Sequence, residues 1–277
     1  MTTRGRIHEA IDKAREQRGN QQPRTTKRPI KAAAERNIVE KPMPAFPEVS
    51  FDHAKCSSNR LLVWDNAGAS KSGSDAPYRV LRTRLLHRAR TNEWAIIGVT
   101  SPGQGDGKSL TALNLALSIA REGNNDVFLI DFDMRRPKMC DYLGASSPLD
   151  ITEFLAGAGH PQDVFFSIGV PNLTFAGSMT KSDQASELLA SNRVEELLGY
   201  ICHVAPRPLV IVDLPPLLAT DDALIVAPKV DACLLVLAEG KTRRDSATKA
   251  LELLSEYELA GIVLNRSSAM QEDYYSY

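Results

Sequence analysis

A glycine-rich loop followed by lysine and serine carries the clearest chemistry in this sequence. The segment 96–110 reads IIGVTSPGQGDGKSL, an apolar run that leads into three glycines and then Lys108-Ser109. Glycine permits backbone angles that aim consecutive N–H groups inward, and these groups form a cradle for phosphate oxygens together with the helix N-terminus. Lys108 is expected to reach the β and γ phosphates of a nucleotide, and the Ser109 hydroxyl to ligate Mg²⁺. The predicted nucleotide-binding residues of the loop are Gly103, Gln104, Gly105, Asp106, Gly107, Lys108, Ser109 and Leu110.

The loop departs from the common G-x-x-x-x-G-K-[ST] pattern at one position, because Pro102 stands where the first glycine is expected. The strand pattern before the loop and the helix pattern after it supply the context that the motif requires. A glycine-rich turn without a ligand is the alternative, and it leaves the lysine and three glycines unexplained.

Acidic residues follow two further apolar runs. Asp131 and Asp133 come after the run 127–130, and Asp213 comes after the run 209–212 and before Pro215-Pro216. Alternation along an extended chain places Asp131 and Asp133 on the same side. The carboxyl ends of parallel strands form the ligand-binding edge of an α/β sheet, so these carboxylates are expected beside the phosphate loop. They predict Mg²⁺ coordination and general-base contact with an incoming hydroxyl, whereas the alternative is a strand that ends in a solvated turn.

These roles divide among a small set of residues. The predicted catalytic residues are Lys108, Asp131, Asp133 and Asp213, and the predicted Mg²⁺ ligands are Ser109, Asp131 and Asp213.

The elements that must position these residues alternate between short apolar runs and helical patterns. Strands are predicted over 95–99, 126–130, 172–176, 209–212, 232–237 and 261–264, and helices over 109–121, 186–204 and 243–257. A further helix is expected to carry Tyr78, Leu81 and Leu85 on one face. Continuous apolar strands alternating with helices indicate a parallel sheet covered on both faces. The fold class is therefore α/β, a P-loop NTPase-type three-layer αβα sandwich with a mostly parallel central sheet.

Composition excludes several other classes. The chain has 277 residues, of which 43% are hydrophobic and 24% charged, and a net charge of −1, so no overall attraction to nucleic acid is expected. No run approaches the roughly 18 apolar residues that span a bilayer, and the N-terminus lacks a signal-peptide core, which predicts a cytoplasmic protein. The four cysteines lack metal-site spacing and are predicted to be small core residues.

Four segments are expected along the chain. Residues 1–50 contain eleven Lys/Arg and six Asp/Glu, a local charge of +5, and are predicted to form a disordered basic tail with a short amphipathic helix over about 5–18. Residues 51–75 are predicted as a linker with a possible strand over 60–64, residues 76–265 as the phosphate-loop domain, and residues 266–277 as a C-terminal tail. Three of the seven tyrosines, Tyr274, Tyr275 and Tyr277, lie in the last four positions.

Taken in this order, the motifs resemble those of the bacterial tyrosine kinases of capsule and exopolysaccharide synthesis. That family carries a Walker A loop, then D-x-D-x-R after four apolar residues, here Asp131 to Arg135, and a Walker B motif ending D-x-P-P, here Asp213 to Pro216. The resemblance covers about residues 75–277. It implies an ATP- and Mg²⁺-dependent autokinase whose phosphoacceptors are the tail tyrosines, and it places Asn265 near adenine.

The resemblance also implies partners. Members work with a transmembrane polysaccharide chain-length regulator, which would bring this chain to the inner face of the plasma membrane, and many pair into a ring through E-x-x-R-x-x-R. Arg79 and Arg82 match the arginines of that motif as oligomer contacts, but Ala76 stands at the glutamate position. A solvated helix face is the alternative for these arginines.

Two other functions compete with the kinase. A nucleotide switch of the partitioning or division-site type shares the fold, but its signature lysine at the second loop position is Gly103 here. A non-catalytic nucleotide-binding scaffold would leave the three acidic groups without a purpose.

Overall fold

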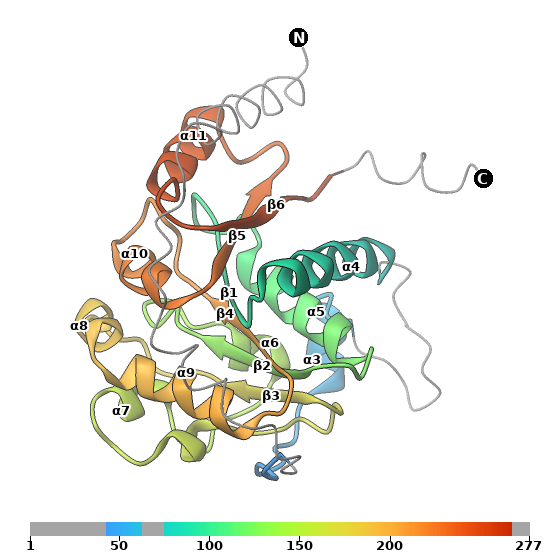
Figure 1. The fold of residues 1–277 in the computed structure, drawn as a ribbon, viewed down its shortest axis with the longest axis vertical. Helices are drawn as coiled ribbons and strands as arrows, with labels where there is room; N and C mark the ends of the chain where they lie inside the picture. The colour runs from blue at the N-terminus through green and yellow to red at the C-terminus, as the bar shows by residue number, and fades with distance from the viewer. Residues whose placement is uncertain (1–42, 63–74, 268–277) are drawn as a thin grey trace.

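A six-stranded sheet, parallel at every pairing, forms the centre of the computed structural model, which describes residues 43–62 and 75–267 (Figure 1). The strands are β1 (Ile96–Thr100), β2 (Asp126–Asp131), β3 (Leu173–Ala176), β4 (Pro208–Asp213), β5 (Ala232–Ala238) and β6 (Leu259–Asn265). Their order across the sheet is β3-β2-β4-β1-β5-β6. Every residue of β1, β2 and β5 is buried, as expected for strands covered on both faces. All six predicted strands are present.

Helices cover both faces of the sheet and give the three predicted layers (Figure 1). One face carries α3 (His53–Ser58), α4 (Asp75–Asn92), α5 (Lys108–Ala120) and α6 (Met139–Leu143). The other carries α7 (Ile151–Leu155), α8 (Ala185–Ala190), α9 (Arg193–Val204), α10 (Asp222–Val226) and α11 (Arg244–Leu253). Short 3₁₀ turns occupy Pro161–Val164 and Ala227–Lys229. Each face has its own apolar core.

Helix α5 holds the phosphate loop in place. It is buried at every position but Leu110, because it packs between the sheet and α4. Its first residue is Lys108, so the loop 101–107 joins two rigid, buried elements, β1 and α5. A loop anchored in this way at both ends presents its backbone groups in a defined arrangement.

The segment predicted as a linker with a strand over 60–64 has a different structure in its described part. Residues 53–58 form α3, capped by Asp52, whose Oδ1 accepts hydrogen bonds from the N–H groups of Ala54 at 2.8 Å and Lys55 at 3.0 Å. Residues 60–62 form no strand. Cys56, Leu61 and Leu62 are buried, so this stretch packs onto the domain. The strand predicted over 60–64 is therefore wrong for residues 60–62, which bond to α5 instead: the Leu62 N–H donates to Asn114 Oδ1 at 2.8 Å, and Asn114 Nδ2 donates to the Arg60 carbonyl at 3.1 Å.

The end of the predicted basic tail also packs onto the domain. The Val49 N–H donates to the Ser167 carbonyl at 2.8 Å, and Phe46 contacts the rings of Phe128 and Phe165. The predicted helix over 5–18 lies outside the described residues, as do Tyr274, Tyr275 and Tyr277.

The helix predicted over 186–204 is two helices, α8 and α9. Ser191 has extended backbone angles (φ −68°, ψ 154°) and its hydroxyl donates to the Leu188 carbonyl at 2.7 Å. Serine competes with helical hydrogen bonding through such local contacts, which explains the break.

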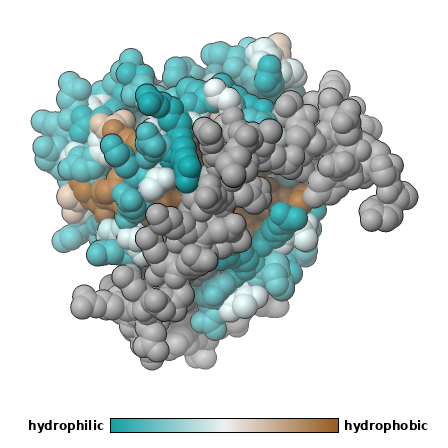
Figure 2. Space-filling view, turned by 90° about the horizontal axis from the view of Figure 1, so that it is seen from above, coloured by the Kyte–Doolittle hydropathy of each residue, from teal (hydrophilic) through white to brown (hydrophobic). Residues whose placement is uncertain are grey.

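On the face seen in Figure 2, polar side chains cover most of the visible described surface, with smaller apolar areas between them. Large apolar side chains that are more than a third exposed are few in the described part: Met179, Leu218 and Leu253. None of the helices in the described ranges is long and apolar enough to cross a bilayer. Cys56, Cys140 and Cys233 are buried as predicted, while Cys202 is only half-buried.

Candidate nucleotide-binding and phosphotransfer site

The strands that carry the predicted site residues end at the same edge of the sheet. β4 lies between β1 and β2, and in the pairing register Asp213 is opposite both Val99 and Asp131. The phosphate loop leaves β1 one residue beyond this level. Both acidic motifs therefore meet the loop, as the sequence predicted from parallel strand ends.

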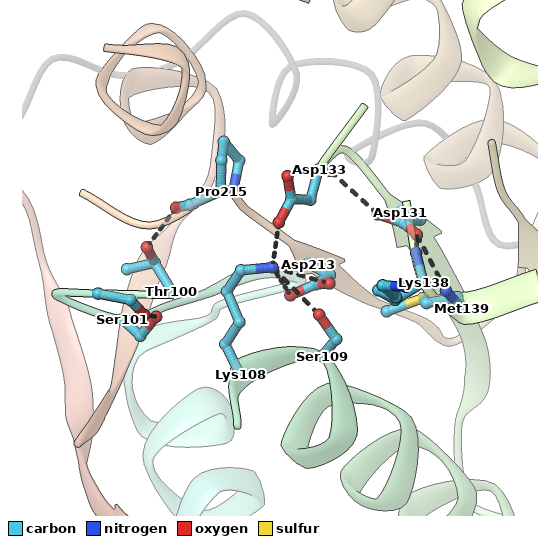
Figure 3. Close-up of polar contacts among 11 residues, drawn as sticks. Thr100, Ser101, Lys108, Ser109, Asp131, Asp133, Lys138, Met139, Asp213 and Pro215 are labelled. Carbon is cyan, nitrogen blue, oxygen red and sulfur yellow. Dashed lines mark hydrogen bonds and ion pairs between the residues drawn. The ribbon is translucent and has the colours of Figure 1, made fainter. Parts of the chain in front are cut away.

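The ammonium group of Lys108 is the centre of the site (Figure 3). Its Nζ lies 2.7 Å from Asp133 Oδ2, 3.2 Å from both carboxylate oxygens of Asp213, and 3.1 Å from Ser109 Oγ. Burial by itself would lower the pKa of Lys108, but the charges of Asp213 and Asp133 outweigh burial and raise it. Lys108 is therefore a permanent cation at the bottom of the site.

Asp131 is fully buried and held by backbone groups. Its Oδ1 accepts from the Asp133 N–H at 3.0 Å, and its Oδ2 accepts from the N–H groups of Lys138 at 3.1 Å and Met139 at 3.2 Å. Burial raises its pKa, although Lys108 and the backbone donors oppose this rise. Asp131 is consequently a stronger base than an exposed aspartate.

Asp213 has the same character. Burial raises its pKa to about 7, the nearby positive charge of Lys108 lowers it only in part, and the negative charge of Asp131 raises it further. The site thus contains three buried carboxylates and one buried ammonium group, an excess of negative charge that calls for another cation.

This donor set fits Mg²⁺ bound together with nucleotide phosphates. Hydroxyl and carboxylate oxygens are the ligands that Mg²⁺ prefers, and it usually binds through one or two carboxylates plus substrate phosphates. Within the described ranges no group of three or more His, Cys, Asp or Glu side chains is arranged to hold a metal by itself. Ser109, Asp131 and Asp213 would thus hold the ion only with the phosphates in place.

The phosphate loop has the backbone shape that the glycines predicted. Gly105 and Gly107 have φ angles of 71° and 99°, in the region that other residues avoid. Asp106 is buried and its Oδ2 accepts the Gly103 N–H at 3.0 Å. Asp106 therefore closes the loop from inside, and its side chain is not free for a ligand.

Three residues at or just after the ends of β5 and β6 contact the loop. Asn265, at the end of β6, donates from Nδ2 to the Asp106 carbonyl at 2.9 Å, and its Oδ1 accepts the Arg266 N–H at 2.8 Å. Asn265, predicted to lie near adenine, therefore lies beside the loop, and both its amide nitrogen and its amide oxygen form hydrogen bonds within the chain. Lys241 donates to the Gln104 carbonyl and Arg266 to the Gly105 carbonyl at 2.9 Å. The sequence analysis missed these two; their only signal is a basic residue soon after the end of each of β5 and β6.

Comparison with known proteins identifies the family. No family model matches the chain. A tyrosine-protein kinase of Bacillus subtilis, YwqD, is 31% identical over 209 residues, which cover 75% of this chain and 87% of that protein. The tyrosine-protein kinase CpsD of Streptococcus agalactiae is 28% identical over 224 residues, 79% of this chain and 96% of CpsD. This chain belongs to the bacterial tyrosine kinases.

Solved structures agree with this assignment. The kinase domain of the Escherichia coli tyrosine kinase ETK superposes with a TM-score of 0.65 and 26% identity, covering 85% of this chain and 94% of that domain. The cell-division ATPase MinD of Pyrococcus furiosus matches with a TM-score of 0.52 at 19% identity, over 63% of this chain and 74% of that chain. MinD shares the fold alone, so the comparisons do not favour the nucleotide switch.

Arg135 of the family motif D-x-D-x-R pairs with an acid. Its Nε lies 2.7 Å from Asp222 Oδ2, and its Nη2 donates to Ser186 Oγ at 3.0 Å. Burial would raise the pKa of Asp222, but the hydrogen bonds from Arg135 and Ser186 hold it below its usual value. This network joins the end of the second motif to α8 and α10, so Arg135 stabilises the wall of the site.

The two arginines predicted as oligomer contacts differ. Arg79 has a side chain that is 59% exposed and lies 3.8 Å from Asp75. Arg82 is largely buried, donates to the Ser118 carbonyl at 2.9 Å, and lies 3.4 Å from Glu122. Arg82 therefore fastens α4 to the end of α5 within one chain, and Arg79 is the one presented to solvent.

Proposed function

We propose that this chain is a protein-tyrosine autokinase that uses ATP and Mg²⁺ to phosphorylate Tyr274, Tyr275 and Tyr277 of its own C-terminal tail. The observation that carries the proposal is the meeting of Lys108, Ser109 and the three buried aspartates behind the phosphate loop. Membership of the tyrosine-kinase family supports the choice of acceptor.

Each residue has a role that follows from its position. The loop N–H groups and Lys108 bind the β and γ phosphates, and Lys108 offsets the charge that grows on the leaving group. Ser109, Asp131 and Asp213 would hold Mg²⁺, which would neutralise phosphate charge. The acceptor hydroxyl of a tail tyrosine forms the new O–P bond as the bond to ADP breaks, and its proton passes to Asp131 or Asp133.

A base is needed because the phenol pKa is near 10, so little phenolate exists at neutral pH. The two carboxylates differ in surroundings: Asp131 accepts three backbone N–H groups and is also a proposed Mg²⁺ ligand, whereas Asp133 pairs with Lys108 at 2.7 Å. Asp131→Asn and Asp133→Asn, assayed separately as kcat against pH, distinguish them. Loss of the base removes the acidic limb of the profile, whereas loss of a phosphate contact raises KM.

The direct test is to incubate the purified protein with γ-labelled ATP and Mg²⁺ and to locate phosphotyrosine by mass spectrometry. Lys108→Met and a variant with all three tail tyrosines changed to phenylalanine serve as comparisons. We expect label in the parent protein and in neither variant. Label that persists in the tail variant would place the acceptors elsewhere, and label in no sample, even with a membrane partner supplied, would favour the nucleotide switch or the scaffold.

The proposal includes the setting implied by the family resemblance. The kinase would regulate exopolysaccharide or capsule synthesis, activated by a transmembrane chain-length regulator that brings it to the inner face of the plasma membrane. Its self-association would use the exposed Arg79, while nucleic acid is not an expected partner. Arg79→Glu is expected to reduce the oligomer mass measured by light scattering, and an unchanged mass would remove Arg79 from the interface.

A further inference from the structure

The carbonyl groups of the phosphate loop are all engaged on the side away from the predicted phosphates. Five consecutive carbonyl oxygens, those of residues 103–107, each accept a hydrogen bond. The donors, in order, are Ser101 Oγ, Lys241 Nζ, Arg266 Nη2, Asn265 Nδ2 and the Thr111 N–H. The middle three come from residues more than 130 positions away in sequence.

The direction of these carbonyls decides the direction of the next amides. In a trans peptide the C=O of one residue and the N–H of the next point to opposite sides. Donors that hold the carbonyls of Gln104, Gly105 and Asp106 outward therefore turn the N–H groups of residues 105, 106 and 107 inward. The N–H groups of residues 105–109 have no acceptor within the described part of the chain. They are left free for an anion.

The donors are themselves held in place by the sheet edge. Asn265 pairs with Ala238 at the end of the β5–β6 ladder, and Thr242 Oγ1 accepts the Ala238 N–H at 2.8 Å, which shapes the turn that carries Lys241. Arg266 has a φ of 60°, a backbone state that is uncommon for arginine, and its N–H bonds to Asn265 Oδ1.

The loop glycines leave room for these donors. A Cβ added at Gly105 would lie 2.6 Å from Lys241 Nζ, and one added at Gly107 would lie 1.9 Å from Asn265 Nδ2. Positive φ favours glycine at both positions, and at Gly107 the close approach of the Asn265 carboxamide adds a second reason. Lys241 Nζ also lies 3.7 Å from Asp106 Oδ1, so it offsets a carboxylate charge inside the loop.

We propose that Lys241, Asn265 and Arg266 form an outer brace, a set of residues that hold the loop carbonyls and so aim the loop amides at the β and γ phosphates. The inference rests on the proposed nucleotide site. The brace also explains why the end of β6, on the far side of β5 from the loop's own strand, belongs to the site.

The test uses the full chain with Lys241→Met, Arg266→Met and the conservative Lys241→Arg. Lys249→Met is the matched control, since Lys249 is an exposed lysine of α11 with no contact to the loop. Calorimetry with ADP and Mg²⁺ measures affinity, and melting temperature is recorded with and without ADP. We expect each methionine variant of the brace to weaken ADP binding about tenfold, as for loss of one hydrogen bond to a charged group, with Lys241→Arg close to the parent.

The brace contacts are present without nucleotide, so the melting temperature without ADP should fall by a small amount, and the further rise caused by ADP should become smaller than in the parent. The control should behave like the parent protein. Brace variants that bind ADP as tightly as the parent, or that melt earlier without ADP yet show the parent's rise in melting temperature with ADP, would overturn the brace and leave the proposed function standing. A parent protein that binds no ADP would overturn the proposed function together with the brace.

Discussion

Asp213→Asn is a substitution whose effect on stability follows from the charge balance of the site. Asp213 is fully buried, and its pKa is raised to about 7 from an ordinary value of 3.8. The folded state therefore holds this proton more tightly than the unfolded state does. Such a group destabilises the fold as pH rises through the interval between the two pKa values.

The size of the effect can be worked out. Each pKa unit corresponds to about 1.4 kcal/mol, so a rise of about three units costs about 4 kcal/mol once the pH exceeds 7. About two of those units lie between pH 5 and pH 7, so Asp213 should cost about 3 kcal/mol of unfolding free energy over that range. Asparagine removes the titrating group, while Lys108 keeps Asp133 as its partner at 2.7 Å.

The assay is urea denaturation at pH 5, 6, 7 and 8, without nucleotide and with a chelator. We expect the parent protein to lose stability relative to Asp213→Asn as pH rises from 5 to 8, although the variant should be unable to bind Mg²⁺ with ADP. Asp141→Asn is the control, because its side chain is 68% exposed, and it should follow the parent. If the unfolding free energies of the parent and Asp213→Asn changed with pH in the same way, the inference that Asp213 is a buried carboxyl with a raised pKa would be refuted.

Three further outcomes are expected. Asp222→Ala should lower the unfolding free energy at pH 7 by about 2 kcal/mol, because Arg135 loses its buried partner. The loss should become smaller at acid pH, where Asp222 is protonated in the parent, and equal losses at pH 3 and pH 7 in denaturant titrations would contradict this. Asp52→Ala should cost about 1 kcal/mol in the same titrations through loss of the α3 cap, and no change would mean that the cap contributes nothing. Gly107→Ala should abolish ADP binding in calorimetry, since its Cβ would meet Asn265 at 1.9 Å; retained affinity would show that the loop can shift away.

Much of the fold could be predicted from local patterns. The apolar runs 127–130 and 209–212 are buried strands as predicted, and the helix predicted after the loop glycines is α5, which begins at Lys108. Parallel strands end at a common edge, so Asp131 and Asp213 could be placed together before any coordinates were known. The break at Ser191 and the cap at Asp52 also come from local hydrogen bonds. The helical pattern over 186–204 and the linker-like composition of 51–75 predicted one helix and a linker instead.

By itself, then, the sequence determined the kind of site: a phosphate loop with one lysine, one serine and three carboxylates at the edge of a parallel sheet. The tertiary structure alone decided which distant residues complete it. Lys241 and Arg266 reach loop carbonyls 137 and 161 positions away, and Arg135 reaches Asp222 across 87 positions. These contacts depend on the order β4-β1-β5-β6 and on the packing of α8 against α10. Strand order and helix packing result from how all the strands and helices bury their apolar faces together, so they cannot be deduced from the spacing of residues within one segment.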